Sequence, residues 1–491
     1  MRNPQEDPII FHFPGGPGVS SLATLLVESG PLAINTDDLT LTLNPNALTQ
    51  VANMVFVDIP AGTGFSYSET QEGWVSSDTI QAANYKDFVK KFLSHNPKFL
   101  GNPLYMSGIS YSGIIVPKAT LELYEGNDRG DQPAFNIQGY ILSSPLTNKF
   151  MDFNSRIEYA HRLALISDDI YQSAINNCNG NYVDTMQANS ACRKSLMSYD
   201  ECTSRINFEN ILEPFLDDNE TDISLIAINK WANMEVVQQA LNVQQGMVGK
   251  FEEQNSTLHY KKGKNDTIYY AYDIFSSYSY HKKLSTKSCR ALIFSGDHDL
   301  TFPYVGVEQW ISSLNLEVEA PWEPFYVDNQ VGGYLTKYAL NNYSLTYATV
   351  KGAGHVVDYY KPKESFVLYV VANNQSNNDS IPYVPIFKGD GYEFRSIRMK
   401  TILMSQDLWD LVSNRLDEND RDRTRLRDHR RKDERVLSII QQGVDDEVFH
   451  VLQQPPCLAQ PGISCRWSIM VILKFELLDY RVYDETLKQY R

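Results

Sequence analysis

Six short segments that are apolar on both faces constrain the fold of this 491-residue chain more than any other feature. Most of them lead into a glycine-containing turn and then into a helical pattern. The segments are Ile9–Phe13, Met54–Asp58, Leu104–Ser107, Gly139–Leu142, Ala291–Phe294 and Leu345–Val350. Strands buried on both faces are typical of parallel sheets that helices cover on both sides. The pattern therefore predicts an α/β fold with a mostly parallel central sheet.

The stretch from about residue 151 to residue 288 interrupts this pattern. It is polar, and it brings Cys178, Cys192 and Cys202 close together in the sequence. We expect it to form a helical cap inserted into the sheet domain. No CxxC pair and no neighbouring histidines would complete a zinc site, so the cysteines favour a disulfide. The spacing does not fix the connectivity, and Cys178 with Cys192 is the pair that we expect.

Charge and composition narrow the range of partners. The net charge of -16 at pH 7 argues against nucleic acid or an anionic membrane as the main partner. No apolar stretch approaches the ~20 residues of a membrane span, and the polar start of the chain lacks the apolar core of a signal peptide. Six N-x-S/T sequons and the cysteines nonetheless favour the secretory pathway. The sequons lie at Asn219, Asn255, Asn265, Asn342, Asn374 and Asn378. Either the protein is cytosolic or its true N-terminus precedes this sequence.

The pattern changes again near residue 373. Residues 373–380 read NNQSNNDS, which is a linker composition, and we place a linker at 373–384. The segment 385–491 is predicted to be helical, with a run of mixed charge between Arg415 and Arg435 that favours a solvated helix face. It shares no pattern with residues 1–372, so we treat it as a separate piece.

The candidate nucleophile is Ser110. The sequence Gly108-Ile109-Ser110-Tyr111-Ser112-Gly113 lies between the predicted strand that ends at Ser107 and a helical run. A strand, a strained turn and a helix with serine at the tip form a nucleophile elbow, in which the neighbouring residues must be small. Ser112 replaces the second glycine of the usual motif, but serine is also small. An ordinary strand-to-helix turn is the alternative interpretation.

A glycine loop follows the first predicted strand and would complete such a site. Acyl transfer needs two N–H donors for the tetrahedral oxyanion, one from the residue after the nucleophile and one from a neighbouring loop. We assign these donors to Tyr111 and Gly16. The loop lacks the Gly-Lys-Ser/Thr ending of a phosphate-binding loop, and we expect neither a cofactor nor a metal.

Asp299 and His355 are the candidate acid and base. Each follows the carboxyl end of a predicted strand, where catalytic groups gather in parallel sheets. The chain order is then Ser, Asp, His, with His355 as the proton carrier and Asp299 as the group that orients it. Asp297 and His298 are the competing candidates.

From about residue 4 to residue 371 the chain resembles the serine carboxypeptidase-like proteins, and more closely their plant acyltransferase branch. The motifs that carry the resemblance are Gly15–Gly18, Val57–Tyr67, Ser110–Gly113, Leu142–Thr147, Ser295–Asp299 and Gly352–His355. The resemblance implies the α/β-hydrolase fold with an inserted cap, catalysis by Asp299 rather than Asp297, and a vacuolar or extracellular location. It also implies a small acyl ester or a peptide C-terminus as the substrate.

Three positions bear on the choice of substrate. The resemblance places Pro14, Gly15 and Ile109 at the substrate site, where family members usually carry asparagine at the first position and an acidic residue at the last. In the carboxypeptidases those two side chains help to hold the substrate's terminal carboxylate. Family members also carry a signal peptide and several dozen further residues before the glycine loop, so we expect an N-terminally truncated domain.

The tail resembles the gag region of copia-type retrotransposons through Val384–Tyr392, Met399–Leu403, Asp407–Val412 and Ile439–Asp446. Two hypotheses for the whole chain follow. It is an acyl-transfer enzyme, acting as a peptidase or as an acyltransferase on sugar esters, or it is a non-catalytic remnant or binding module from a degenerate or mis-joined gene. The sequence leaves the oligomeric state open.

Overall fold

An eight-stranded sheet is the main element of the computed structural model, which describes residues 3–183, 189–217, 222–255 and 269–373. The strand order is β10-β11-β12-β9-β7-β6-β1-β4. The strands are β1 (Ile9–Phe13), β4 (Asn53–Phe56), β6 (Leu104–Ile109), β7 (Ile137–Ser143), β9 (Arg290–Gly296), β10 (Glu317–Val327), β11 (Gln330–Leu340) and β12 (Tyr343–Val350). All pairings from β12 to β4 are parallel, and those among β10, β11 and β12 are antiparallel. The predicted α/β fold with a mostly parallel sheet is confirmed.

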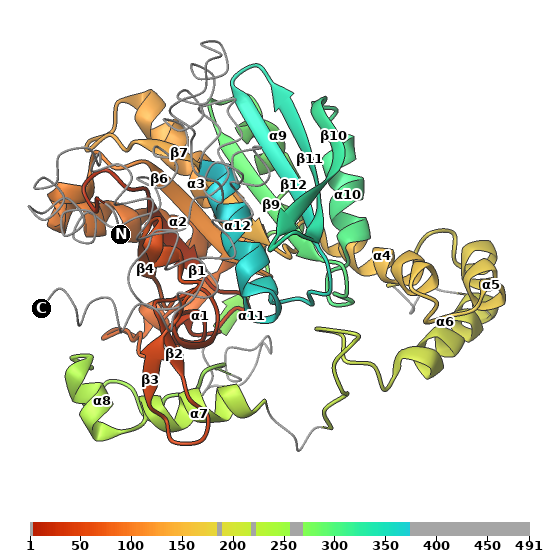
Figure 1. The fold of residues 1–491 in the computed structure, drawn as a ribbon, viewed down its shortest axis with the longest axis horizontal. Coiled ribbons are helices and arrows are strands. Elements are labelled where there is room, and N and C mark those ends of the chain that lie inside the picture. Colours follow the sequence, from red (N-terminus) through yellow and green to blue (C-terminus); the bar gives the residue numbers. More distant parts are fainter. Residues whose placement is uncertain (1–2, 184–188, 218–221, 256–268, 374–491) are drawn as a thin grey trace, which may run out of the picture. The chain divides into compact units, whose positions relative to one another are not determined.

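Side chains of the parallel strands alternate between two cores. In β1, Ile9, Phe11 and Phe13 join one cluster of buried residues and Ile10 joins the other. The first core also takes residues from α2 (Asp78–His95), α3 (Ser112–Arg129), α9 (Tyr278–Leu284) and α10 (Tyr304–Ser313), and the second from α11 (Val357–Tyr360) and α12 (Pro362–Asn373). Helices therefore cover both faces of the sheet (Figure 1), as its doubly apolar strands require.

The strands β10 and β11 were not predicted from the sequence. They form a hairpin whose turn contains Asp328 and Asn329 at φ angles of 49° and 60°. Asp and Asn tolerate this left-handed conformation, which suits tight hairpin turns. Most side chains of β10 are exposed, so the strand lacks the continuous apolar character that marks the buried strands.

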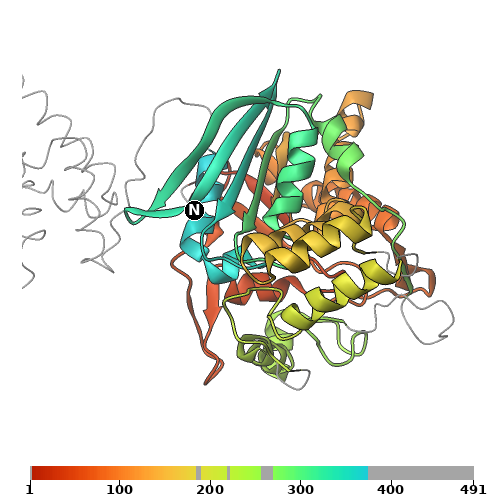
Figure 2. The same ribbon diagram turned by 90° about the vertical axis from the view of Figure 1, so that its right-hand side faces the viewer.

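Between β7 and β9 the chain leaves the sheet and forms most of the remaining helices (Figures 1 and 2). These are α4 (Lys149–Arg162), α5 (Asp168–Cys178), α6 (Ser190–Thr203), α7 (Ile223–Ala232) and α8 (Glu235–Ala240). The disulfide Cys178–Cys192 joins the end of α5 to the start of α6, so the expected pairing is confirmed. Cys202 is exposed and Cys289 is buried, and both carry free thiols.

The smaller elements complete the described part. They are α1 (Ser21–Val27), the antiparallel pair β2 (Leu32–Ile34) and β3 (Leu41–Leu43), and the parallel pair β5 (Val75–Ser77) and β8 (Tyr269–Ala271). None of the described helices is both long and apolar enough to cross a membrane. The predicted linker from residue 374 onward and the predicted gag-like tail lie outside the described residues.

Candidate active site

Three strands of the sheet bring the predicted catalytic residues together at one edge. Ser110 follows the last residue of β6, Asp299 lies three residues beyond β9, and His355 lies five residues beyond β12. In the sheet β7 separates β6 from β9, and β12 is the next strand along. The carboxyl ends of parallel strands face the same edge, so residues far apart in the sequence meet there.

Ser110 lies at the tip of a strained turn. Its φ angle is 58°, in the left-handed region that non-glycine residues rarely adopt. Hydrogen bonds hold the turn on both sides: the Ser110 N–H donates to the Ser143 carbonyl, and the Leu146 N–H donates to the Ser110 carbonyl, each at 3.0 Å. The strain is local and costs about 1–3 kcal/mol. It projects the Ser110 hydroxyl beyond the end of β6.

The three side chains form a continuous hydrogen-bond chain. The His355 Nε2 lies 2.8 Å from the Ser110 Oγ, and the His355 Nδ1 lies 2.9 Å from the Asp299 Oδ2. The other carboxylate oxygen of Asp299 accepts from the backbone N–H groups of Thr301 and Phe302, at 2.7 and 3.1 Å. Asp299 is fully buried and His355 nearly so. This geometry allows Ser110 to pass its proton to His355.

The environment of His355 favours its protonated form. Burial lowers the pKa of His355, but the Asp299 charge and its hydrogen bond, with a smaller effect of the Glu209 charge, raise it above the ordinary value. The Phe302 ring packs edge-on against the imidazole, with 5.3 Å between ring centroids. An imidazolium formed during proton transfer is therefore stabilised in place.

The competing pair, Asp297 and His298, bond to each other. His298 Nδ1 lies 2.5 Å from the Asp297 Oδ1, which also accepts the Gly352 N–H at 2.7 Å. The pair thus fastens the loop that follows β12 to the loop that follows β9. Of the two aspartates, the structure places Asp299 beside His355.

The glycine loop packs directly on the nucleophile. A Cβ at Gly15 would lie 2.6 Å from the Ser110 Cβ, so only glycine fits there. Gly16 has a φ angle of 106°, which glycine adopts without strain. Within the described residues no acceptor takes the Gly16 N–H. The structure therefore packs Gly15 against Ser110. Of the two predicted oxyanion donors, Gly16 is the next residue of this loop and Tyr111 is the next residue after Ser110.

Ser112 stands where the usual nucleophile motif has its second glycine, and its contacts show why serine suits this position. Its buried hydroxyl donates to the Pro14 carbonyl at 2.7 Å and so ties the glycine loop to the start of α3. A glycine at this position could not make that bond. Pro14 and Ile109, two of the predicted substrate residues, are both buried beside Gly15 and Ser110.

Asp58 is a supporting residue that the sequence motif contained but to which no role was assigned. Its carboxylate accepts from the Ser21 N–H and hydroxyl, at 2.7 and 2.9 Å, and from the Ser20 hydroxyl at 3.0 Å. Asp58 lies two residues beyond β4, so these bonds anchor the start of α1 to the sheet. The glycine loop, which runs from β1 to α1, is thereby held at both ends.

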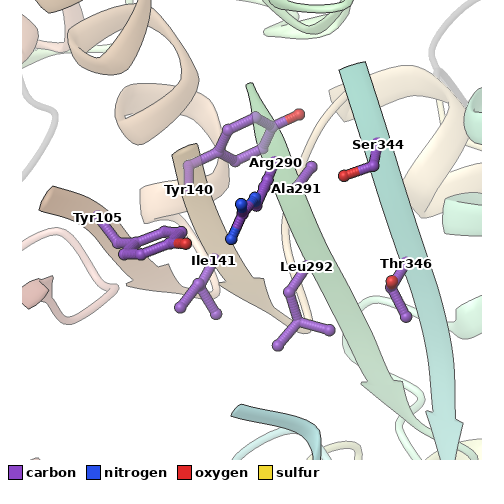
Figure 3. Close-up of a pocket in the computed structure, with 8 residues that line it drawn as sticks. All are labelled: Tyr105, Tyr140, Ile141, Arg290, Ala291, Leu292, Ser344 and Thr346. Atoms are coloured by element: carbon purple, nitrogen blue, oxygen red, sulfur yellow. The ribbon is translucent and has the colours of Figure 1, made fainter. Parts of the chain in front are cut away.

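A small cavity at the opposite end of the strands does not belong to this site. It measures about 10 Å³, room for about one water molecule. Figure 3 shows that its lining comes from β6, β7, β9 and β12. The residues are Tyr105, Tyr140, Ile141, Arg290, Ala291, Leu292, Ser344 and Thr346. All lie in the first part or the middle of their strands, away from the edge that carries Ser110.

Among the buried carboxyl groups that form no ion pair in the described part of the chain, four have strongly raised pKa values. Burial raises the pKa of Glu28 to about 8, of Asp152 and Glu253 to about 7, and of Asp358 to about 6. The Asp358 charge raises the pKa of Glu28 further. Each of these groups therefore holds its proton to a higher pH in the folded protein than in the unfolded chain.

We expect the protein to be more stable near pH 5 than at pH 8. The four carboxyls ionise near their ordinary pKa in the unfolded chain but only at higher pH in the folded protein. The stability that they contribute is therefore lost as pH rises through their folded pKa values. Burial lowers the pKa of His12 to about 4 and of His281 to about 3. Below pH 6.5 these two histidines make the folded protein more stable as pH rises, and so they offset part of the effect of the four carboxyls. The net loss from pH 5 to pH 8 should be on the order of 5 kcal/mol.

Urea unfolding at a series of pH values tests this expectation. Asp358→Asn should make the free energy of unfolding vary less with pH, because it removes one of the four ionisations. Asp87→Asn, at an exposed position on α2, should leave this pH dependence unchanged. A free energy of unfolding that rises steadily from pH 5 to pH 8 would contradict the account.

Comparisons with known proteins place most of the chain in one family. A family model described as serine carboxypeptidase matches residues 1–372. Serine carboxypeptidase-like 16 of Arabidopsis thaliana is 41% identical over 376 residues, which cover 75% of this chain and 83% of the relative. Serine carboxypeptidase-like 2 of the same plant is 38% identical over 376 residues, with 75% and 82% covered.

A solved structure supports the fold. The chain is similar to Kex1(delta)p, a prohormone-processing carboxypeptidase from Saccharomyces cerevisiae, with a TM-score of 0.62 and 19% identity. The match covers 79% of this chain and 85% of the yeast chain. At this level of identity the likeness concerns the fold alone.

Proposed function

Because this chain belongs to the serine carboxypeptidase family, we propose that it is an acyl-transfer enzyme that forms a covalent acyl-enzyme on Ser110. The observation that carries the proposal is the hydrogen-bond chain from Ser110 through His355 to the buried Asp299. Such a chain activates a hydroxyl that is otherwise a weak nucleophile.

The first half of the reaction acylates Ser110. As the Ser110 Oγ attacks the carbonyl carbon of the substrate, the His355 Nε2 takes the hydroxyl proton, and the carbonyl oxygen becomes an oxyanion. The N–H groups of Gly16 and Tyr111 donate to this oxyanion. When the intermediate collapses, the bond to the leaving group breaks, and His355 returns the proton to that group. Asp299 keeps the imidazole oriented and stabilises its positive charge.

The second half releases the acyl group. A water molecule or an acceptor hydroxyl gives its proton to His355 and attacks the acyl-enzyme carbonyl. The ester bond to Ser110 breaks, and Ser110 regains a proton from His355. Water as acceptor makes the protein a hydrolase, and an organic hydroxyl makes it an acyltransferase. We favour neutral acyl esters, such as sugar esters, as donors because Pro14 and Ile109 supply no side-chain donor for a terminal carboxylate.

We propose a vacuolar or extracellular location. The Cys178–Cys192 disulfide suits an oxidising compartment, and the buried carboxyls suit an acidic one. Asn342, one of the sequons, is exposed in the turn between β11 and β12, where a glycan could be attached. Mass spectrometry of the protein from plant tissue would test this, and an unmodified Asn342 together with a reduced Cys178–Cys192 pair would count against the secretory route.

Pre-steady-state kinetics test the proposed function. Mixed with excess p-nitrophenyl acetate, the protein should release nitrophenol in a burst of about one equivalent per chain, followed by slower turnover. Peptide mapping of the quenched reaction should find the acetyl group on Ser110. A linear release with no burst and no acetylated Ser110 peptide would contradict the proposal and favour a non-catalytic protein.

A further inference from the structure

A mostly buried arginine on α4 carries a positive charge whose hydrogen-bond acceptor is a neutral oxygen. The Arg156 guanidinium donates from Nε and Nη2 to the Thr301 carbonyl, at 3.1 and 2.7 Å. It also lies 4.5 Å from the ring centroid of Phe153 and 5.4 Å from that of Phe208. None of the ion pairs in the described part of the chain includes Arg156. Since buried arginines are usually paired, this charge calls for a partner at longer range.

One peptide group joins the guanidinium to the acid of the triad. The Thr301 carbonyl and the Phe302 N–H belong to the same peptide unit. The carbonyl accepts from Arg156, and the N–H donates to the Asp299 Oδ1 at 3.1 Å. A cation at the oxygen end and a carboxylate at the N–H end polarise the peptide in the same direction, so each bond strengthens the other. The hydrogen-bond chain that starts at Ser110 therefore continues beyond Asp299 to Arg156.

Packing on two sides holds the guanidinium in this place. The Phe153 ring, which the guanidinium contacts, packs edge-on against Phe302 with 5.8 Å between ring centroids, and Phe302 packs against the His355 imidazole. On the other side, the Phe208 carbonyl accepts the Leu300 N–H at 2.9 Å, next to the acid of the triad. The guanidinium is thus fixed relative to both the acid and the base.

We propose that Arg156 is a positioning residue of the triad, whose charge holds Asp299 ionised and opposes premature protonation of His355. The inference rests on the proposed acyl-enzyme at Ser110 and names a residue that controls its base. Arg156 forms no hydrogen bond with Ser110 or His355 among the described residues, so it acts through Asp299 and through its charge.

Three charges act on His355 from the elements around it. Burial has the largest effect and lowers the pKa of His355. Asp299, beyond β9, and Glu209, in the segment before α7, raise it, and Arg156 on α4 lowers it. A protonated His355 cannot take the serine proton, so activity should fall as pH drops below this pKa. Removing the Arg156 charge should raise the pKa and move the loss of activity to higher pH.

The titratable groups that act on Arg156 are Asp152 on α4, Tyr199 on α6 and Asp299. Burial raises the pKa of Asp152 to about 7, against the opposing effect of two backbone N–H donors. Burial also raises the pKa of Tyr199, which stays neutral. In acid Asp152 is therefore mostly protonated, and Asp299 is the carboxylate that balances the Arg156 charge.

The pH dependence of kcat/KM for p-nitrophenyl acetate tests this role. The wild type should lose activity in acid with one apparent pKa, that of His355 in the free protein. Arg156→Gln removes the charge but keeps an amide that can donate to the Thr301 carbonyl, and it should move the loss of activity to a pH about 0.5–1 unit higher. Arg156→Met, a second neutral variant, should do the same. Arg156→Lys keeps the charge and should stay close to the wild type.

Arg162→Gln is the matched control on the same helix, because Arg162 pairs with Glu158 at 2.6 Å and its charge does not act on His355. It should leave the pH profile unchanged. A merely structural Arg156 would lower the rate at every pH without moving the apparent pKa. That result, or an equal shift in the Gln and Lys variants, would overturn the inference. If the wild-type protein releases no nitrophenol and Ser110 is never acylated, the proposed function itself fails.

Discussion

Replacing Ser110 with alanine is expected to lower kcat for ester hydrolysis by about five orders of magnitude. The Ser110 Oγ is the atom that attacks the substrate, and no other hydroxyl accepts or donates a hydrogen bond at the His355 Nε2 in the described structure. His355→Ala should cost a similar factor, because a serine hydroxyl without its base is a weak nucleophile. Steady-state assays with p-nitrophenyl acetate would measure both losses.

The double variant distinguishes a functional unit from two independent contributions. Residues that act in one proton transfer are strongly non-additive, so Ser110→Ala with His355→Ala should be hardly slower than either single variant. His298→Ala is the matched control, because His298 pairs with Asp297 and not with Asp299. Full activity in Ser110→Ala would show that another residue is the nucleophile.

The second large effect concerns the substrate's terminal group. A free carboxylate loses its hydration on entering a pocket, which costs several kcal/mol unless donors replace the water. Pro14 has neither a side-chain donor nor a backbone N–H, and the buried Ile109 side chain has neither donor nor charge. Two missing contacts of about 1.5–3 kcal/mol each should weaken carboxylate recognition by about two to four orders of magnitude.

The oxyanion donors are backbone groups, so ester chemistry should not suffer from these two substitutions. We therefore expect kcat/KM for an N-blocked dipeptide methyl ester to exceed that for the free acid, with the C-terminal amide as a third comparison. Pro14→Asn combined with Ile109→Glu restores the residue types that the family usually carries and should raise the rate on the free acid. If the free acid is the best of the three wild-type substrates, the carboxypeptidase alternative moves ahead.

The parts of the fold that the sequence predicted are those with a local signal. Strands such as β1 and β6 are short, apolar on both faces and followed by glycine turns, so their pattern is distinctive. The hairpin of β10 and β11 exposes most of one strand, and its polar residues such as Glu317 and Glu323 hide the strand pattern. Its clearest signal is the Asp328-Asn329 turn, which a search for hairpin turns could have found.

The residues of the site likewise differ in whether the sequence could predict them. Ser110, Asp299 and His355 were predicted because each lies just beyond a predicted strand, and the parallel sheet brings such positions together. Asp78 and Lys149 both contact the Tyr111 hydroxyl, and neither contact had a local signal. A charged residue at the first position of a helix, as both are, resembles an ordinary solvent-exposed residue. Their contacts with Tyr111 span 33 and 38 positions of the chain, and only the folded structure reveals them.

Covalent labelling by a fluorophosphonate probe tests the central claim most directly, because such probes react with a serine only when a base activates it. We predict that the intact protein gains the mass of one probe, that peptide mapping places it on Ser110, and that heat-unfolded protein, Ser110→Ala and His355→Ala remain unlabelled. A folded wild-type protein that takes up no probe, or takes it up at another residue, would contradict the account.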